Sequence, residues 1–422
     1  MPVSAPQIVL ERLHHLPGGK ALLELAAGRD DVELVGGAVR DLLLGHTPRE
    51  LDVVVADDAI GFAGELARRV GSLAGENPDE RFESTFHERF RTALVWWGGG
   101  RIDIASRRAE SYPAPGALPD VRPGSPEQDL LRRDFTVNAI AVSLTDAQMR
   151  SAPHAEEDMA RGVLRVLHEQ SFIDDPTRLL RMARYAARLG FEVEGSTATL
   201  AREAIVEGAL GTVSGARIGT ELRLALGEPG AVAALAAMSE LGVLGALHPR
   251  LRFEEPVAGK ALALLPEDGR ADLALLASLV LPLVLRADGD PHAEIVALLD
   301  RWNFPAGDRD RVAAAAVAVP RLIEELGETE RPSALRETAL GVPLEGVSLA
   351  GALGAEEPAR RWLEQTRHVH LEITGEDLLA AGIPEGPEIG YRLEAVLRRK
   401  LDDELASPGR DAELTAALDA CV

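Results

Sequence analysis

Residues 34–55, LVGGAVRDLLLGHTPRELDVVV, combine residue types that could hold a phosphate beside a metal ion. Gly36 and Gly37 end a short apolar run, and because they lack Cβ atoms their backbone N–H groups can approach a phosphate closely. Arg40 follows one helical turn later and could offer its planar fork of donors to phosphate oxygens. The segment therefore predicts a strand, a phosphate-binding turn and a helix in succession.

Carboxylates occur at three positions that could share one metal site. Glu50 and Asp52 are two residues apart in a β-branched run, so a strand would direct both side chains to one face, and hard oxygen ligands suit Mg²⁺. A solvated acidic strand would carry the same pair, but the preceding glycine turn and helix favour nucleotide chemistry on a metal. Asp103 lies between Ile102 and Ile104, and beside the other two carboxylates it would complete a site for two metal ions.

A second cluster, residues 129–141 with the sequence DLLRRDFTVNAIA, joins charged and apolar residues. Arg132 and Arg133 could hold the triphosphate of a nucleotide. Asp134 could orient one of these arginines, and Asn138 lies one helical turn beyond. A helix start with charged residues around an apolar stretch would give the same pattern.

A third cluster, residues 172–191, predicts a helix after Pro176 with one basic stripe opposite an apolar face. The arginines recur at three- and four-residue spacing, at Arg178, Arg181, Arg184 and Arg188. An ordinary amphipathic surface helix would show the same spacing. Asp175 and Arg178, at i and i+3, would offer an acceptor and a fork of donors to a planar base. They match cytosine or adenine and oppose like groups in guanine or uracil.

The remaining sequence predicts the elements that must position these clusters. Short β-branched runs indicate strands at Glu33–Val35, Leu51–Val55, Ala93–Trp97, Arg101–Ala105 and Ala139–Ser143. The Pro- and Gly-rich stretch from Ser111 to Glu127 is expected to lack regular structure and, at this length, to be functional. From Asp158 onward the periodicity is helical, and the Leu- and Ala-rich second half predicts helices packed on helices.

Composition bounds the class of protein. With 422 residues the chain should form two or more domains, and its net charge of −23 argues against general affinity for nucleic acid while allowing a local basic cleft. The single cysteine, Cys421, excludes an internal disulfide. The apolar run Ala271–Leu285 is too short to span a bilayer and predicts a buried helix. With no signal-peptide pattern at the N-terminus, these features indicate a cytoplasmic protein that does not enter membranes.

The three clusters together resemble the class II tRNA nucleotidyltransferases, the family of CCA-adding enzymes and bacterial poly(A) polymerases. The resemblance rests on GGAVRDLLLG with the carboxylate pair, on RRDFTVNAIA and on DDPTRLLRMARYAARLGF, with further support from DMARGVLRVL, VSGARIGTEL and ITGEDLLAAGIPEGPEIGYRLEAVL. It implies an α+β fold: a polymerase-β-like nucleotidyltransferase head (1–145), a helical neck with a nucleotide-selecting helix (146–245), and a helical body and tail (246–422). The later domains would grip the tRNA acceptor stem and 3′ end by backbone and shape. The family's optional HD phosphohydrolase domain is not expected.

The resemblance also implies roles for individual residues. Glu50 and Asp52 would be the ligands of Mg²⁺, although the family pattern has Asp at both positions, and Glu50 puts metal preference or rate in question. The implied nucleotide contacts are Gly37, Arg40, Arg133, Asp175, Arg178, Arg181 and Arg184.

The implied activity is template-independent addition of CMP and AMP, from CTP and ATP, to the 3′ end of tRNA, as CCA addition or repair. The alternative is A addition to tRNA ending in CC, because RRAESYPAPGALPDV resembles the version in A-adding members. CC addition is disfavoured because the loop Arg107–Gln128 is present, and poly(A) synthesis because the chain ends in DAELTAALDACV rather than in a basic extension. Two alternative hypotheses assign the chain to other functional classes. One is a non-catalytic RNA-binding protein, suggested by Glu50 and the acidic net charge, and the other is a small-molecule nucleotidyltransferase.

Overall fold

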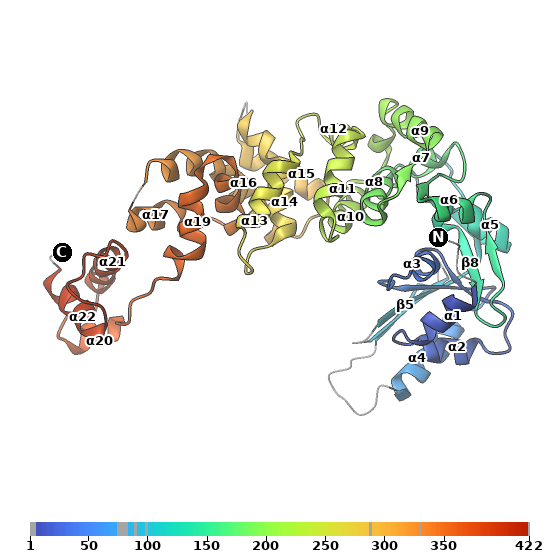
Figure 1. Ribbon diagram of the computed structural model, residues 1–422, viewed down its shortest axis with the longest axis horizontal. Helices are drawn as coiled ribbons and strands as arrows, with labels where there is room; N and C mark the ends of the chain where they lie inside the picture. The colour runs from blue at the N-terminus through green and yellow to red at the C-terminus, as the bar shows by residue number, and fades with distance from the viewer. Residues whose placement is uncertain are drawn as a thin grey trace. The chain divides into compact units, whose positions relative to one another are not determined.

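The computed structural model describes residues 6–73, 83–87, 91–97, 100–286, 289–329 and 331–420 (Figure 1). Cys421 lies outside these residues. The chain divides into two compact units: Met1–Val213 with Leu241–Val243, and Ser214–Glu240 with Leu244–Val422. The division into head, neck, and body with tail at residues 145 and 245 stays a prediction.

The first unit is built on a seven-stranded sheet in the order β3-β4-β5-β2-β1-β8-β9. Its strands are β1 (Val32–Val35), β2 (Leu51–Val55), β3 (Glu83–His87), β4 (Thr92–Trp97), β5 (Gly100–Ser106), β8 (Ile140–Ser143) and β9 (Met149–Ser151). Within this sheet β2 and β5 pair in parallel, whereas the other neighbouring strands pair antiparallel. The five runs predicted as strands all lie in this sheet.

The parallel pairing of β2 and β5 decides which side chains share a face. Asp52 is the register partner of Asp103, and Leu51 is that of Ile102. Because side chains alternate along a strand, both carboxylates lie on one face while Leu51 and Ile102 lie on the other. Both apolar residues are buried. The expected strand orientation of Ile102 and Ile104 is thereby confirmed.

A glycine turn joins β1 to the helix α3 (Gly37–Leu44). Gly36 has φ +68° and ψ −133°, a backbone conformation that L side chains rarely adopt. Gly45, at φ +83°, ends the helix by donating its N–H to the carbonyls of Asp41 and Leu42. The predicted order of strand, glycine turn and helix is confirmed.

One prediction about the connection after β5 is wrong. The stretch Ser111–Glu127 was expected to be irregular, but β6 (Arg108–Ser111) and β7 (Asp120–Pro123) form an antiparallel hairpin. Proline at position 123 is compatible with this short two-stranded pair, which has only one neighbour for each strand. The hairpin leads into α5 (Pro126–Leu131), which Ser125 and Gln128 begin with a reciprocal capping box.

The rest of the first unit is mostly helical. Its further helices are α1 (Pro6–His14), α2 (Gly19–Ala26), α4 (Ala59–Leu73), α6 (Ala155–Arg161), α7 (Ser171–Asp174), α8 (Thr177–Leu189) and α9 (Gly195–Val206). Short 3₁₀ turns occur at Thr136–Asn138 and Ala209–Thr212. The strands β10 (Val163–Leu164) and β11 (Glu192–Val193) pair in parallel, which the helical pattern after Asp158 did not predict.

The described part of the second unit consists of helices. They are α10 (Gly215–Leu226), α11 (Ala231–Glu240), α12 (Val243–Leu247), α13 (Glu255–Leu264), α14 (Ala271–Leu285), α15 (Pro291–Arg301), α16 (Ala306–Gly327), α17 (Pro332–Ala339), α18 (Leu344–Ala350), α19 (Glu356–Glu364), α20 (Gly375–Ala380), α21 (Pro387–Leu401) and α22 (Arg410–Asp419), with a π-helical turn at Gly351–Ala355 and a 3₁₀ turn at Thr366–His368. The predicted buried helix is α14, in which most side chains are buried.

Within the described residues, no single helix has the length and apolar character needed to cross a membrane. One bent pair, Pro332–Ala339 with Leu344–His368, passes that test by length and composition alone.

Candidate active site

Three carboxylates converge on one face of the sheet. Glu50 lies just before β2, Asp52 within it, and Asp103 on β5 at the register position of Asp52. One oxygen from each side chain lies within 4.8 Å of the other two, a spacing that suits shared coordination of a cation. The predicted meeting of Asp103 with the other two carboxylates is confirmed as geometry.

The environment of Asp52 differs from that of an ordinary surface carboxylate. Its burial, together with the nearby charges of Glu50 and Asp103, raises the pKa of Asp52 to about 7. Arg133 and Arg101 oppose this shift by their positive charge. Glu50, in contrast, is exposed, so the site has an inner and an outer carboxylate. Perturbation of this kind at a cluster of like charges is typical of functional sites.

Arg133 lies directly over the glycine turn. A Cβ on Gly36 would stand 2.7 Å from Nη1 of Arg133, so only glycine gives this guanidinium its place. Asp129 accepts a hydrogen bond from Nη2 of Arg133 at 2.9 Å. The buried Nε–H of Arg133 has no hydrogen-bond partner among the described residues, and it is a donor that an anion could use.

Asp129, rather than Asp134, orients the arginine pair, which corrects the prediction for Asp134. Asp129 also accepts from Nε and Nη2 of Arg132, at 3.0 and 2.9 Å. Burial would raise the pKa of Asp129, but both guanidinium groups outweigh it and hold that pKa below its usual range. The C-terminal end of α5, not a helix start, brings these charges together, because Asp129 lies within α5, Arg132 is its C-cap and Arg133 follows.

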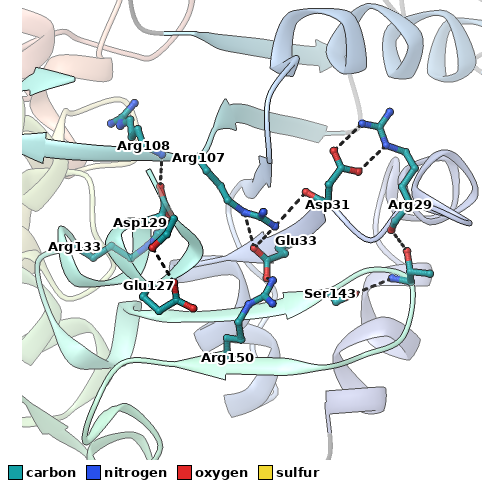
Figure 2. Close-up of polar contacts among 12 residues, drawn as sticks. Arg29, Asp31, Glu33, Arg107, Arg108, Glu127, Asp129, Arg133, Ser143 and Arg150 are labelled. Carbon is teal, nitrogen blue, oxygen red and sulfur yellow. Dashed lines mark hydrogen bonds and ion pairs between the residues drawn. The ribbon is translucent and has the colours of Figure 1, made fainter. Parts of the chain in front are cut away.

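Figure 2 shows Asp129 between Arg108 and Arg133, and two further arginines converging on Glu33. Glu33, buried on β1, pairs with Val54 of β2 and therefore lies on the same sheet face as Asp52. Arg107 donates to it from Nη2 at 2.9 Å, and Arg150 of β9 forms a second ion pair with it. These contacts fix the chain where it leaves β5 for the hairpin.

Asp134 instead links the segment after α5 to helix α8. It accepts from Nε and Nη2 of Arg181, at 2.9 and 2.6 Å, and from Nδ2 of Asn138 at 2.9 Å. Burial would raise the pKa of Asp134, but Arg181 and the amide of Asn138 outweigh it and hold that pKa well below its usual range. Asn138, in a 3₁₀ turn, in turn accepts from Nη1 of Arg40.

Arg40 is almost fully buried, and its guanidinium contacts Asn138 and Asp41 in the described structure. These contacts make it a support for the turn between β1 and α3, and its direct contact with a phosphate stays a prediction. Its guanidinium also lies 5.2 Å from the ring centroid of Tyr185 on α8.

The arginines of α8 do not form a solvated stripe. Arg178 and Arg184 are buried, and Arg188 donates to Asp41 of α3 at 2.7 Å. Arg181 and Arg184 both lie over the ring of Tyr185, at 5.5 and 4.8 Å from its centroid. The reading of α8 as an ordinary amphipathic surface helix is therefore wrong, because its basic residues bind other parts of the first unit.

The candidate base-reading pair begins α8. Asp175 accepts from the backbone N–H and the hydroxyl of Thr177, at 3.1 and 2.6 Å, which satisfies an unpaired N–H at the helix start. Arg178 donates from Nη2 to the carbonyl of Arg132 at 2.9 Å and from Nη1 to the hydroxyl of Ser171. The guanidinium of Arg178 is thus held next to the arginine pair.

The loop of the β6–β7 hairpin also reaches this region. Gly116 donates its N–H to the carbonyl of Ile173 in α7 at 3.0 Å. Burial, with the charge of Glu110, raises the pKa of Tyr112 to about 12, while nearby Arg178 opposes the shift. The loop is therefore packed against the segment that carries Asp175.

The comparisons with known proteins bear on the whole chain. Residues 32–165 match the family model of the poly A polymerase head domain. Over 88% of its length the chain is 32% identical to the CC-adding tRNA nucleotidyltransferase of Deinococcus radiodurans, of which it covers 85%. The chain belongs to the tRNA nucleotidyltransferase family.

Other members of this tRNA nucleotidyltransferase family match at greater coverage of the chain. It is 33% identical over 99% of its length to the A-adding tRNA nucleotidyltransferase of Geobacter sulfurreducens, yet it spans only 49% of that relative. The Thermotoga maritima CCA-adding enzyme complexed with tRNA superposes with a TM-score of 0.77 at 27% identity over 98% of each chain. The expected fold, a polymerase-β-like head with a mostly helical remainder, is confirmed.

Proposed function

We propose that the chain transfers a nucleoside monophosphate from a nucleoside triphosphate to the 3′ end of tRNA. The terminal 3′ oxygen would form a bond to the α-phosphorus while the bond to pyrophosphate breaks. The observation that carries this proposal is the set of three carboxylate oxygens within 4.8 Å of one another, on the same unit as Arg133 and the glycine turn. Family membership supports the reaction class.

The acidic group fits a divalent cation, Mg²⁺ by family resemblance. Its donors are hard carboxylate oxygens, and it combines an inner residue, Asp52, with an exposed one, Glu50. Glu50 and Asp52 would hold the ion, with Asp103 beside them, and when bound it would supply charge neutralisation and activation of the attacking hydroxyl. The extra methylene of Glu50, relative to Asp, changes reach but not charge.

The triphosphate would lie against the glycine turn. The N–H of Gly37 and the free Nε–H of Arg133 would supply donors, and Asp129 holds Arg133 in place. The N–H of Gly36, predicted as a second backbone donor, already donates to the carbonyl of Ile140 at 3.0 Å, so Gly36 serves the turn by its backbone conformation. Asn138 and Asp134 support this arrangement through Arg40 and Arg181, so these residues act by positioning. Electrostatic preorganisation of this kind stabilises charge on the leaving pyrophosphate.

Asp175 and Arg178 would select the base of the incoming nucleotide. Burial of Arg178 and its contacts with Ser171 and Arg132 restrict the guanidinium to one orientation, which a reader of base edges requires. A pair that offers one acceptor and a fork of donors suits adenine and cytosine. Arg181 and Arg184, three residues apart on α8, both lie over the ring of Tyr185 on the same helix, and Arg181 also ties α8 to Asp134.

For the product, we favour addition of AMP to tRNA that ends in CC. Support comes from the A-adding relative that matches along 99% of the chain, and from the resemblance of the hairpin sequence to A-adding members. Full CCA addition, the first expectation from the sequence, is the second candidate, supported by the fold match to a CCA-adding enzyme. The helical unit would grip the acceptor stem, and the cytoplasm is the expected compartment.

Incorporation of labelled ATP and CTP into three tRNA transcripts tests the proposal. The transcripts end at the discriminator base, at C and at CC, and each nucleotide is supplied alone and with the other. AMP addition to the CC end only is the expected result. CMP addition to the shorter ends together with AMP addition to the CC end would replace it with full CCA addition. No incorporation on any transcript would contradict the proposed reaction.

A further inference from the structure

Arg101 contacts two of the three carboxylates of the acidic group, Glu50 and Asp103. It is two residues before Asp103 on β5, so both side chains share the sheet face of the site. Its Nε and Nη2 donate to the two oxygens of Asp103, at 3.1 and 2.8 Å. Its Nη1 lies 3.4 Å from Oε2 of Glu50. One guanidinium therefore bridges two of the three carboxylates.

The contact uses the same oxygens that a divalent cation would need. Arg101 takes both oxygens of Asp103 in a bidentate pair, the geometry in which arginine binds carboxylates best. A metal ion in contact with these oxygens would meet a positive guanidinium in the same space. Repulsion between the two cations opposes simultaneous binding.

We propose that Arg101 is a built-in counter-cation that a divalent metal must displace from Glu50 and Asp103. This inference rests on the proposed metal site. Arg101 thereby lowers the affinity of the nucleotide-free protein for the metal and keeps the carboxylates paired until the metal arrives. Because half of the Arg101 side chain is exposed, it can swing away without disturbing the core.

Glu50 has a specific part in this arrangement. Its side chain is one methylene longer than that of the aspartate expected from the family resemblance. The added length carries the carboxylate from a position just before β2 towards Arg101 on the neighbouring strand. Glu50→Asp should therefore weaken the pairing with Arg101 and leave the pairing with Asp103.

Direct binding of Mn²⁺ to the full chain, followed by the electron paramagnetic resonance of the free ion without nucleotide, tests the inference. Arg101→Gln should lower the dissociation constant for Mn²⁺ about fivefold, the scale of a partly exposed ion pair. The matched control is Arg91→Gln, which removes the same charge at the start of β4 but breaks an ion pair with Asp57 outside the acidic group. The control should bind Mn²⁺ like the wild type.

An unchanged or weaker affinity in Arg101→Gln would overturn the inference. A double-mutant cycle adds a second test: the gain from Arg101→Gln should shrink when residue 50 is aspartate, whereas additive effects would remove Glu50 from the account. Binding that Asp52→Asn does not reduce would place the ion elsewhere and overturn the inference with the metal site. If Arg101→Gln binds Mn²⁺ more tightly but the wild-type chain incorporates no nucleotide, the result would support the inference while contradicting the proposed reaction.

Discussion

Asp52 and Asp103 are register partners on β2 and β5, two parallel strands that are 51 residues apart in the sequence at this point. The parallel pair places both carboxylates side by side on one face, and Glu50 joins them from the residue before β2. The sheet itself, rather than a loop, therefore sets the geometry of the acidic group. Sites built on strands are positioned more rigidly than sites on loops.

Gly36→Ala should weaken nucleotide binding through Arg133. A Cβ at this position would stand 2.7 Å from Nη1 of Arg133 and would push the guanidinium away from the turn. Loss of a charge-assisted hydrogen bond predicts a rise of about tenfold in the KM for nucleotide. Steady-state kinetics with ATP measures it.

The control for this substitution is Gly190→Ala. Gly190 has φ +65°, close to the φ of Gly36, but a Cβ there would meet nothing within 4 Å. Alanine at Gly190, where ψ is +30°, costs about 1 to 2 kcal/mol of backbone strain, and alanine at Gly36, where ψ is −133°, costs more. Urea unfolding of both variants therefore measures the strain separately from the KM. An equal rise of KM in both variants would assign the effect to strain instead.

Arg178→Ala should reduce the selectivity of the enzyme among ATP, CTP and UTP. If the guanidinium reads base edges as a fork, its loss costs about 1 to 3 kcal/mol of discrimination. Arg178→Lys keeps the charge but not the fork, and it should lose discrimination too. Competition between labelled nucleotides gives the ratios, and unchanged selectivity in both variants would move base reading to other residues.

Arg181→Ala should destabilise the first unit by leaving the buried carboxylate of Asp134 without its charged partner. Removal of one partner from a buried pair costs about 3 kcal/mol, reduced here because Arg181 is partly exposed. Urea unfolding measures the change. Arg202→Ala on α9, which removes an exposed arginine, should change the free energy of unfolding little, and an equal loss in both variants would contradict the role of the pair.

Glu194 gives a pH-dependent contribution to stability. Glu194 is the N-cap of α9. Burial alone would raise the pKa of its carboxyl group, but hydrogen bonds from Ser196 and Thr197 outweigh burial and lower this pKa from 4.5 to about 2. A folded-state pKa below the unfolded value stabilises the protein above about pH 4.5, and this stabilisation is lost as the pH falls towards 2.

Glu194→Gln should therefore lower the melting temperature at pH 7, by the loss of about 1 kcal/mol expected for a cap. The difference from the wild type should vanish as the pH approaches 2. Glu203→Gln, on the same helix, removes an exposed carboxylate and should show no such convergence. A difference for Glu194→Gln that persists at low pH would contradict the assignment.

Local sequence patterns predicted much of the fold. The β-branched runs, the glycine turn and the apolar helix α14 were found because each depends on neighbours in the chain. The β6–β7 hairpin was missed because its proline- and glycine-rich sequence has the composition of a loop. Hydrogen bonds between paired strands give such segments regular structure, but a single sequence does not show which residues will pair.

The sequence predicts the contacts of charged side chains less well than it predicts strands. Asp103 was expected at the site from its alternation with isoleucines, but Asp129 and Arg101 were missed because their roles depend on contacts across the fold. The arginines of α8 had the spacing of a solvated stripe, yet burial directs them towards Tyr185 and Asp41. Periodicity reports that a helix has two faces and does not report what covers each face.

The most direct test of the account compares AMP incorporation by the wild type and by Asp52→Asn, on tRNA that ends in CC and with Mg²⁺ present. Asparagine keeps the shape of Asp52 but removes its negative charge, so folding, checked by circular dichroism, should be unchanged. The account predicts incorporation by the wild type and a loss of at least about 100-fold in the variant. Comparable incorporation by both proteins would contradict the acidic group as the catalytic centre.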